Sequence, residues 1–244
     1  MNTTVASIMA AGKGTRMGST LPKPLIPLKG KPILQYIIEA FQKAGIEEII
    51  VIVGHKRNEI KKAIGDQVHY IVQNEQKGTA HAVQQAKGFT NWGNKDLFVF
   101  VGDCPLITSE TIQSLFDHHK ETNADCTFLT AEFPDTPPYA RIVRDQTRKL
   151  IKCVEEKNAS EDERKIKEVM TSHLIFKGGP LFKYLDQVPP DDETGEYYII
   201  DVINIFLDKG LKVQTLNSTK YHELIGLNTP QELAWAEDLL EVNS

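Results

Sequence analysis

The chain has 244 residues, of which 41% are hydrophobic and 25% are charged, a balance that excludes a disordered chain and a coiled coil. No apolar run approaches the roughly 20 residues that span a bilayer, so we expect no membrane contact. The net charge of −5 argues against nucleic acid as a partner, because phosphate backbones attract basic surfaces. Three scattered cysteines indicate neither a disulfide framework nor a zinc site, and the N-terminus lacks a signal-peptide pattern, so the expected location is the cytoplasm.

Charge is distributed unevenly along the chain. All 33 Asp and Glu residues lie after position 38, and the first of them is Glu39. The charged residues before it are all basic: Lys13, Arg16, Lys23, Lys29 and Lys31. A basic, glycine-containing segment at the start of an acidic protein indicates a binding site for an anion, and a chance distribution is the alternative.

The first half of the chain alternates apolar runs with segments of helical periodicity. A buried strand is predicted over residues 5–9, and the glycines and prolines of residues 10–32 predict a long loop. Apolar residues at helical spacing between Ile33 and Phe41 predict a helix that Gly45 ends. The elements expected next are strands over 48–53, 68–72, 97–101 and 126–132 and helices over 58–64, 79–86 and 108–122. This alternation predicts an α/β fold of three layers, in which helices cover both faces of a mostly parallel sheet.

The second half of the chain is less regular. Its pattern predicts strands over 140–144, 150–155, 169–176 and 213–216, the first two around a turn at 145–149, and helices over 179–185 and 197–209. A C-terminal helix is expected after Thr229, which forms a capping box with Glu232 around Pro230. Since no linker or repeat interrupts the chain, we expect one domain over 1–244, with the irregular half as a lobe over the carboxyl edge of the sheet.

The glycine-rich segment 10–18 (AAGKGTRMG) follows the first predicted strand. It lacks the spacing that a P-loop requires between its first glycine and Gly-Lys-Ser/Thr. It also departs from the dinucleotide fingerprint, since its third glycine is one place late and prolines follow at 22, 24 and 27. A phosphate-binding loop remains, in which glycines let backbone N–H groups approach phosphates while Lys13, Arg16 and Lys23 supply positive charge. A glycine turn with solvated lysines is the alternative.

Several motifs occur in an order that resembles a known enzyme family. The runs AAGKGTRM over residues 10–17 and LPKPL over 21–25 look like the signature of the sugar-1-phosphate nucleotidyltransferases. Further motifs follow at 73–82 (QNEQKGTAHA), 102–106 (GDCPL), 154–157 (VEEK), 195–201 (GEYYIID) and 226–228 (GLN). The ordered set covers almost the whole chain and is similar to the uridyltransferase domain of bacterial N-acetylglucosamine-1-phosphate uridyltransferases. The resemblance implies a Rossmann-like nucleotidyltransferase fold, with a nucleotide-binding part over about 1–125 and a sugar-binding lobe over about 126–228.

The resemblance also implies roles for residues of the nucleotide-binding part. Arg16 and Lys23 are the catalytic candidates: Arg16 with Lys13 would contact the triphosphate and the departing pyrophosphate, and Lys23 the α-phosphoryl group. The nucleotide-binding candidates are Ala10, Ala11, Gly12, Lys13, Gly14, Gln73, Gly78 and Thr79. A Gln amide and backbone groups provide the paired donors and acceptors that a base edge needs. A polar loop followed by a helix cap is the alternative for the segment 73–79.

The candidate metal ligands are Asp103 and Asn228. Asp103 follows an apolar strand, at the edge where open α/β sheets bind ligands, and the resemblance implies that it holds Mg²⁺ together with Asn228. Mg²⁺ takes one or two protein oxygens and fills its shell with phosphate oxygens and water, which suits a lone Asp and Asn. The alternatives are a structural cap for Asp103 and a turn residue for Asn228.

The sugar-binding candidates that the resemblance implies are Ala140, Glu155, Met170 and Tyr198. Surface charge is the alternative for Glu155, and a core position is an equal alternative for Tyr198. Two candidates depart from the family pattern: Ala140 stands where the family has Gly in Tyr-Gly-Arg-Ile, and Met170 where it has Asn in Glu-x-Asn-Thr-Gly. Both positions face the sugar in the family. The resemblance makes N-acetylglucosamine 1-phosphate the first expected acceptor, and these two departures count against it, so glucose or another hexose 1-phosphate is the alternative.

The activity that the resemblance implies is Mg²⁺-dependent transfer of a nucleotidyl group from an NTP to a sugar 1-phosphate, with release of pyrophosphate. UTP is the first expected donor and dTTP the second. A non-catalytic nucleotide-sugar sensor is the alternative, although Lys23, Asp103 and Asn228 are all present. Bifunctional members of the family also carry an acetyltransferase β-helix of hexapeptide repeats. The sequence up to Ser244 contains none, so no acetyltransferase domain is expected.

Overall fold

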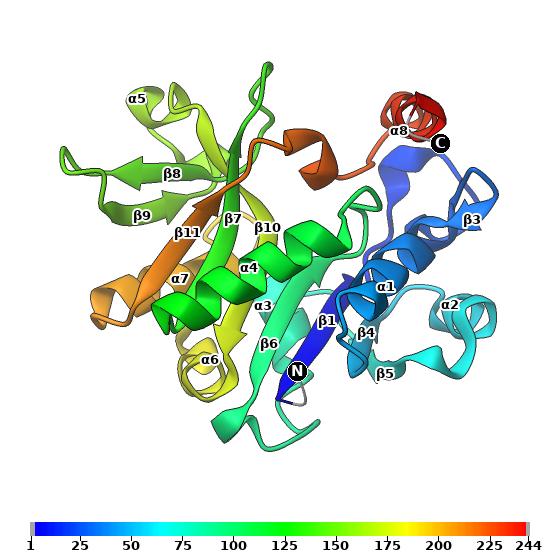
Figure 1. Ribbon diagram of the computed structural model, residues 1–244, viewed down its shortest axis with the longest axis horizontal. Coiled ribbons are helices and arrows are strands. Elements are labelled where there is room, and N and C mark those ends of the chain that lie inside the picture. Colours follow the sequence, from blue (N-terminus) through cyan, green and yellow to red (C-terminus); the bar gives the residue numbers. More distant parts are fainter. Residues whose placement is uncertain (1–2, 243–244) are drawn as a thin grey trace.

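The computed structural model describes residues 3–242, and a nine-stranded mixed sheet runs through it (Figure 1). The strands of its main path are, in spatial order, β11 (Val213–Asn217), β7 (Cys126–Glu132), β10 (Glu168–Lys177), β6 (Asp96–Val101), β1 (Thr4–Ala10), β4 (Ile49–Val53) and β5 (His69–Val72). β1 pairs in parallel with β4 and β6, as do β4 with β5 and β11 with β7. β10 is antiparallel to both β6 and β7. The sheet is therefore mostly parallel, as predicted.

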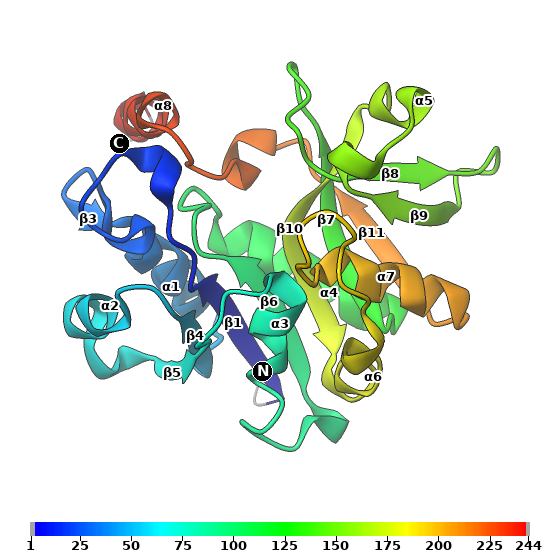
Figure 2. The same cartoon turned by 180° about the vertical axis from the view of Figure 1, so that it is seen from behind.

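Helices cover both faces of the sheet, because alternate residues of each strand point to opposite sides. Val5 of β1 packs in one hydrophobic cluster and its neighbour Ala6 in the other. The helices on the Ala6 side are α1 (Ile33–Lys43), α2 (Arg57–Ile64) and α4 (Ser109–Thr122). Those on the Val5 side are α3 (Thr79–Gln84), α6 (Gly178–Tyr184) and α7 (Ile199–Asp208). The two views from opposite sides show these layers (Figure 1, Figure 2), and the predicted three-layer α/β fold is confirmed.

A smaller antiparallel unit extends the sheet. This unit alone is called the lobe below, and it is only part of the sugar-binding lobe expected over about 126–228. It consists of β8 (Arg141–Arg144), β9 (Leu150–Val154) and α5 (Glu161–Arg164), and β8 joins β10 at the pair of Arg141 and Val169. The predicted turn between β8 and β9 is closed by a hydrogen bond from Asp145 N to Lys149 O of 2.9 Å. In Figure 1 the lobe lies at the upper left, and β1 runs from the N-terminus upward and to the right.

The last helix, α8 (Pro230–Val242), packs against the segment that joins β1 to α1, where its Ala236 shares a buried cluster with Ile26 and Leu28. The predicted capping box at its start is present. Thr229 N donates to Glu232 Oε2 at 2.8 Å, and Glu232 N donates to Thr229 Oγ1 at 3.2 Å. These two bonds satisfy backbone donors that a helix N-terminus leaves unpaired.

Some boundaries differ from the expected ones. The helix expected over 197–209 begins at Ile199, because Tyr197 N donates to Lys77 O (2.8 Å) and Tyr197 O accepts from Ala80 N (2.9 Å), which holds this residue outside the helix. The helix expected over 79–86 is α3, which ends at Gln84. The N–H groups of residues 85–87 then bond to the carbonyls three residues before them, which is the tighter pattern of a 3-10 turn. The loop expected over 10–32 contains two 3-10 turns, Thr15–Met17 and Lys23–Leu25, and a hairpin of β2 (Pro27–Leu28) and β3 (Lys31–Pro32).

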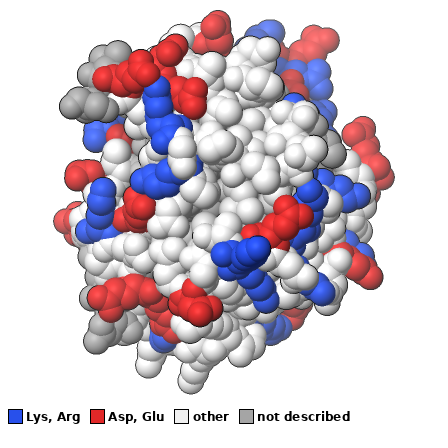
Figure 3. All heavy atoms as spheres, turned by 90° about the vertical axis from the view of Figure 1, so that its right-hand side faces the viewer, with Lys and Arg blue, Asp and Glu red and all other residues white. Residues whose placement is uncertain are grey.

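The surface carries charges of both signs. Figure 3 views the side of the molecule on which α8, β3 and α2 lie, and there Lys and Arg side chains alternate with Asp and Glu. Within the described residues of that side, no continuous basic area of the kind that nucleic acid requires is visible. None of the helices between residues 3 and 242 has the length and apolar character to cross a membrane.

Candidate active site

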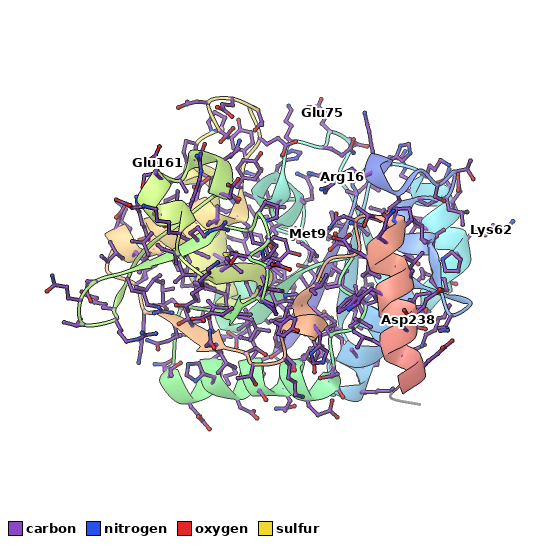
Figure 4. All side chains as sticks on the ribbon, turned by 90° about the horizontal axis from the view of Figure 1, so that it is seen from above. Met9, Arg16, Lys62, Glu75, Glu161 and Asp238 are labelled. Carbon is purple, nitrogen blue, oxygen red and sulfur yellow. The ribbon has the colours of Figure 1, made fainter. Side chains whose placement is uncertain are left out.

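A cavity of about 450 Å³ opens at the carboxyl ends of β1 and β6. Its lining residues are Met9, Ala10, Ala11, Gly12, Lys13, Gly14, Arg16, Met17, Lys23, Pro24, Gln73, Gln76, Gly78, Thr79, Ala82, Val101, Gly102, Asp103, Glu196 and Asn228. Parallel strands carry their following loops to one edge of a sheet, where such folds bind ligands. Figure 4 looks down onto this edge, with Met9 near the centre, Arg16 beside it and Glu161 of the lobe on the far side. The catalytic, nucleotide-binding and metal candidates all line this one cavity.

The basic loop, residues 11–25, places Lys23 in the cavity by close contact with Gly14. Gly14 has a φ of +60°, and a Cβ on it would lie 2.6 Å from the Cβ of Lys23. Only glycine allows this approach, because it lacks a Cβ and adopts positive φ without strain. Pro24 and Leu25, which follow Lys23 in its 3-10 turn, are buried and anchor the base of the lysine stem. Lys13 is exposed on the same loop and has no hydrogen bond or ion pair with another described residue.

Lys23 bridges the two candidate metal ligands. Its Nζ donates to Asp103 Oδ2 at 2.5 Å and to Asn228 Oδ1 at 2.8 Å. Asn228 Oδ1 also accepts from Arg16 Nη2 at 2.9 Å. The amide of Asn228 is oriented by its own donation from Nδ2 to the Gly226 carbonyl at 2.9 Å. Residues that are 80 and 205 positions apart from Lys23 in the sequence are thus held around one cationic nitrogen.

Backbone contacts fix the position of Asp103. Gly102 N donates to Met9 O at 3.0 Å, and a Cβ on Gly102 would lie 2.8 Å from that same carbonyl oxygen. The carbonyl of Asp103 accepts from Leu227 N at 2.8 Å, which ties the segment that carries Asn228 to the end of β6. The Asp103 carboxylate therefore projects from a rigid strand end, which favours a ligand-binding role over a role as a cap.

The predicted base-reading segment, residues 73–79, also lines the cavity. The buried Gln73 side chain donates from Nε2 to Gly78 O at 3.2 Å and lies 3.0 Å from His81 Nδ1. Gly78 has a φ of +98°, and a Cβ there would lie 2.4 Å from Tyr197 O. Thr79 Oγ1 accepts from Ile199 N at 2.9 Å, so this hydroxyl supports the start of α7 and retains its own proton for donation.

The four sugar-binding candidates lie in the second half of the chain and do not line this cavity. Ala140 and Met170 are buried in the hydrophobic core of the lobe side, joined by a bond from Met170 N to Ala140 O of 2.9 Å. Tyr198 lies beside the lobe, where its hydroxyl is 3.0 Å from Thr194 Oγ1. Glu155 is half-buried at the end of β9, and burial raises the pKa of its carboxyl. Their role in binding sugar stays a prediction.

Comparison with known proteins identifies the family. Residues 6–174 match the model of the MobA-like NTP transferase domain, which is more than half of the chain. The chain belongs to the MobA-like NTP transferase family. The transferase is therefore an enzyme of nucleotidyl transfer, as the ordered motifs implied. The matched region includes the basic loop and Asp103 but ends before Asn228.

Individual relatives of the transferase agree with the resemblance seen in its motifs. It is 43% identical over 235 residues to the bifunctional protein GlmU of Geobacillus sp. (strain WCH70) and 39% identical over 241 residues to that of Bacillus subtilis (strain 168). These matches cover 96% and 99% of the chain but 51% and 53% of the relatives. The chain thus spans about half the length of the curated relatives it matches.

Two solved structures share the fold of the transferase. One, described as a glucose-1-phosphate thymidylyltransferase from Bacillus anthracis in complex with sucrose, has a TM-score of 0.78 at 21% identity, covering 97% of this chain and 94% of that one. The other is a UDP-glucose pyrophosphorylase complexed with UDP-glucose, with a TM-score of 0.78 at 16% identity and coverage of 98% and 99%. Identities this low establish the fold alone.

The structure adds residues to the site of the transferase that sequence reasoning did not single out. Gln76 lines the cavity, and its Nε2 donates to Gln73 O at 3.0 Å. Glu196 reaches the same cavity from the segment before α7. Both residues lie inside motifs that carry the resemblance, so the motif positions were a signal for them. Tyr139 precedes Ala140 in the segment compared with the family's Tyr-Gly-Arg-Ile, and its hydroxyl accepts from Gly226 N at 3.2 Å, next to the metal candidates.

Proposed function

We propose that the transferase moves a nucleotidyl group from UTP to a sugar 1-phosphate, forming a UDP-sugar and pyrophosphate. The observation that carries this proposal is the meeting of the basic loop with the Asp103–Asn228 oxygen pair inside one cavity. The basic loop can bind an anion, and the Asp103–Asn228 oxygen pair can bind a divalent cation. A metal-bound nucleoside triphosphate requires both in the same place.

The residues of the cavity act by position and charge. Lys13 and Arg16 bind the triphosphate and the leaving pyrophosphate, and Lys23 binds the α-phosphoryl group that is transferred. The phosphate oxygen of the sugar 1-phosphate attacks the α-phosphorus in line, the bond from that phosphorus to the β-phosphate bridging oxygen breaks, and pyrophosphate leaves with the electron pair. Since the attacking phosphate is already ionised, no general base is needed, and orientation with charge neutralisation supplies the catalysis.

The donor set of the cavity fits Mg²⁺. Asp103 Oδ2 and Asn228 Oδ1 converge on one cationic nitrogen, and Asn228 is oriented with its oxygen toward that point. A carboxylate and an amide oxygen suit a hard cation that keeps most of its shell for phosphate oxygens and water. Within residues 3–242 there is no group of three or more His, Cys, Asp or Glu side chains that would form an all-protein metal cage. When bound, Mg²⁺ would neutralise charge on the phosphates of the nucleotide.

N-acetylglucosamine 1-phosphate is the acceptor that we propose first, because the ordered motifs resemble the uridyltransferase domain of N-acetylglucosamine-1-phosphate uridyltransferases over almost the whole chain. Glucose or another hexose 1-phosphate is the second candidate. It is favoured by Ala140 and Met170, which place a methyl group and an apolar chain where the family pattern has glycine and asparagine. On the donor side, UTP stands first and dTTP second.

A pyrophosphate-release assay tests the proposal. Each of UTP, dTTP, CTP, ATP and GTP is combined with N-acetylglucosamine 1-phosphate, glucose 1-phosphate or galactose 1-phosphate, with Mg²⁺ and with EDTA. The expected result is release with UTP and a sugar 1-phosphate in the presence of Mg²⁺, and none with EDTA. Absence of release with every pair would contradict the proposed activity, and release with UTP alone would indicate hydrolysis instead of transfer.

A further inference from the structure

We propose that Lys23 occupies the cation position in the nucleotide-free enzyme, so that a divalent metal enters only together with a nucleoside triphosphate. This inference rests on the proposed function, because it concerns how the metal of that reaction is admitted. It adds a second role to Lys23. The ammonium group excludes free metal ions from Asp103 and Asn228 before it contacts the phosphates.

The hydrogen bonds around Lys23 leave little bonding capacity for a metal. Asn228 Oδ1 has two acceptor lone pairs, and it already accepts from Lys23 Nζ at 2.8 Å and from Arg16 Nη2 at 2.9 Å. Asp103 Oδ2 accepts from Lys23 Nζ at 2.5 Å. A metal that approached these two oxygens would meet an ammonium group in contact with both. It can bind to this pair of oxygens only if Lys23 leaves.

Burial strengthens this exclusion. The side chains of Lys23 and Asp103 are only 13% and 24% exposed, so their attraction is screened less than that of a surface pair. A freed ammonium group also needs a new partner, because an unpaired charge in a half-buried site is unfavourable. The phosphates of a nucleotide would supply the partner that Lys23 loses.

The Nζ atom of Lys23 can move within the cavity, whereas its Cβ is held in place. Contact with Gly14 and the buried turn at Pro24 fix its Cβ, whereas the flexible four-carbon stem lets Nζ reach different points of the same cavity. The charges lining the cavity favour the same order of events. Three cationic side chains, Lys13, Arg16 and Lys23, face two carboxylates, Asp103 and Glu196. The empty cavity therefore repels a free cation and attracts a nucleotide that carries one.

The test measures Mn²⁺ binding without nucleotide, by isothermal calorimetry and by the EPR signal of free Mn²⁺, and needs no turnover. Lys23→Met should bind one Mn²⁺ at least about tenfold more tightly than the parent, because the competing ammonium is removed and its carboxylate partner is left unpaired. Lys13→Met is the matched control: it removes the same charge from the same cavity but no contact with Asp103, and it should change the affinity by less than about threefold. Adding Asp103→Asn to Lys23→Met should abolish the gain.

A second measurement on the parent enzyme covers the case in which Lys23→Met does not fold. With a non-hydrolysable UTP analogue present, the parent should bind Mn²⁺ at least about tenfold more tightly than the analogue alone does, and without the analogue it should bind Mn²⁺ no better than its Asp103→Asn variant. Equal Mn²⁺ affinity for the parent and Lys23→Met would overturn the inference, as would an equal gain in Lys13→Met. Failure of the pyrophosphate assay, with these Mn²⁺ results intact, would instead contradict the proposed reaction.

Discussion

At the scale of single residues, the Asp103 carboxylate can be changed without disturbing the sheet, because its backbone holds the strand end in place. We predict that Asp103→Asn lowers kcat by about 100- to 1000-fold, corresponding to roughly 2.7–4 kcal/mol of lost electrostatic stabilisation. The midpoint of thermal unfolding should fall only slightly, since the side chain faces the cavity and the amide oxygen that replaces the carboxylate can still accept from Lys23 Nζ. Pyrophosphate release at saturating Mg²⁺ and UTP measures the first quantity, and circular dichroism the second.

Asp117→Asn is the matched control for this prediction. Asp117 lies on α4 and accepts from Gln113 Nε2 at an exposed site away from the cavity. It should keep both turnover and thermal stability. Near-normal turnover of Asp103→Asn would remove Asp103 from the site.

The sugar choice is also a matter of single residues. We predict that Ala140→Gly combined with Met170→Asn shifts the ratio of kcat/KM toward N-acetylglucosamine 1-phosphate and away from glucose 1-phosphate. The reason is that a pocket that hydrogen-bonds a polar group discriminates against analogues that leave its partner unpaired, and Met170 has no such group. Competition between the two acceptors in one reaction measures the ratio of their kcat/KM values. This ratio does not depend on the concentration of folded enzyme, which an asparagine in the core could lower.

The two single variants separate the contributions of these positions. Ala140→Gly frees the space of one methyl group, and Met170→Asn restores an amide. An unchanged ratio in the double variant would mean that neither position sets the choice of sugar. The assignment of these residues to the sugar pocket, which the structure places in the core and outside the main cavity, would then be wrong.

At the scale of elements, strand β10 contains a bulge in which a serine adopts a backbone conformation that favours glycine. The register with β7 shifts between Met170 and Leu174, and Ser172 within this bulge has a φ of +57°. A left-handed conformation costs a non-glycine residue about 1–2 kcal/mol, and glycine relieves it at some cost in unfolded-chain entropy. We therefore predict that Ser172→Gly raises the free energy of unfolding by about 0.5–1 kcal/mol, measured by urea denaturation.

Ser114→Gly makes the same chemical change in a helix and serves as the control. Ser114 lies in the middle of α4, where glycine is a poor helix former, so this variant should lose about 0.5 kcal/mol of unfolding free energy. Stabilisation at position 172 together with destabilisation at position 114 is expected. If Ser172→Gly also destabilises, the serine side chain contributes to the bulge in a way that outweighs the backbone strain.

Local sequence predicted most elements because hydrophobic periodicity is a local property. The spacing from Ile33 to Phe41 alone located α1, and Thr229 with Glu232 located the start of α8. The start of α7 could not be predicted in this way. Tyr197 is extended because its backbone bonds to Lys77 and Ala80, which are more than 100 residues away in the chain.

At the scale of the whole molecule, stability should depend on pH through His173. This residue is buried in β10 with Nε2 unpaired, and burial lowers its pKa from 6.5 to about 4. Between these values the unfolded chain binds more protons than the folded one, so the free energy of unfolding decreases as the pH falls through this window. The loss should reach about 2 kcal/mol between pH 7 and pH 5.

The buried carboxyl groups affect the free energy of unfolding mostly below this pH window, or they raise it as the pH falls. Burial opposes the ionisation of Glu168, but hydrogen bonds from Arg144 and Thr130 outweigh it and keep the pKa low, so stability from this group is lost only below pH 4.5. Burial raises the pKa of Glu155 and of Asp201, and their protonation stabilises the folded state as the pH falls. A comparison of variants is therefore needed to isolate His173.

Urea denaturation of His173→Gln at pH 7 and pH 5 supplies this comparison. The free energy of unfolding should fall by about 2 kcal/mol less between pH 7 and pH 5 in this variant than in the parent, whatever the absolute stability of the variant. His69→Gln, at an exposed position of β5, should retain the parental difference. An equal pH dependence in His173→Gln and the parent would show that another group controls it.

The three-layer fold, the family and the residue types of the catalytic candidates could be predicted from the sequence, because periodicity and short motifs involve neighbouring positions. How those candidates meet depends on the packing of distant elements. Lys23, Asp103 and Asn228 are distant in the chain, and only the parallel pairing of β1 with β6 and the bond from Leu227 N to Asp103 O bring them together. The bridging position of Lys23 depends on distances between elements, a property that no local pattern contains.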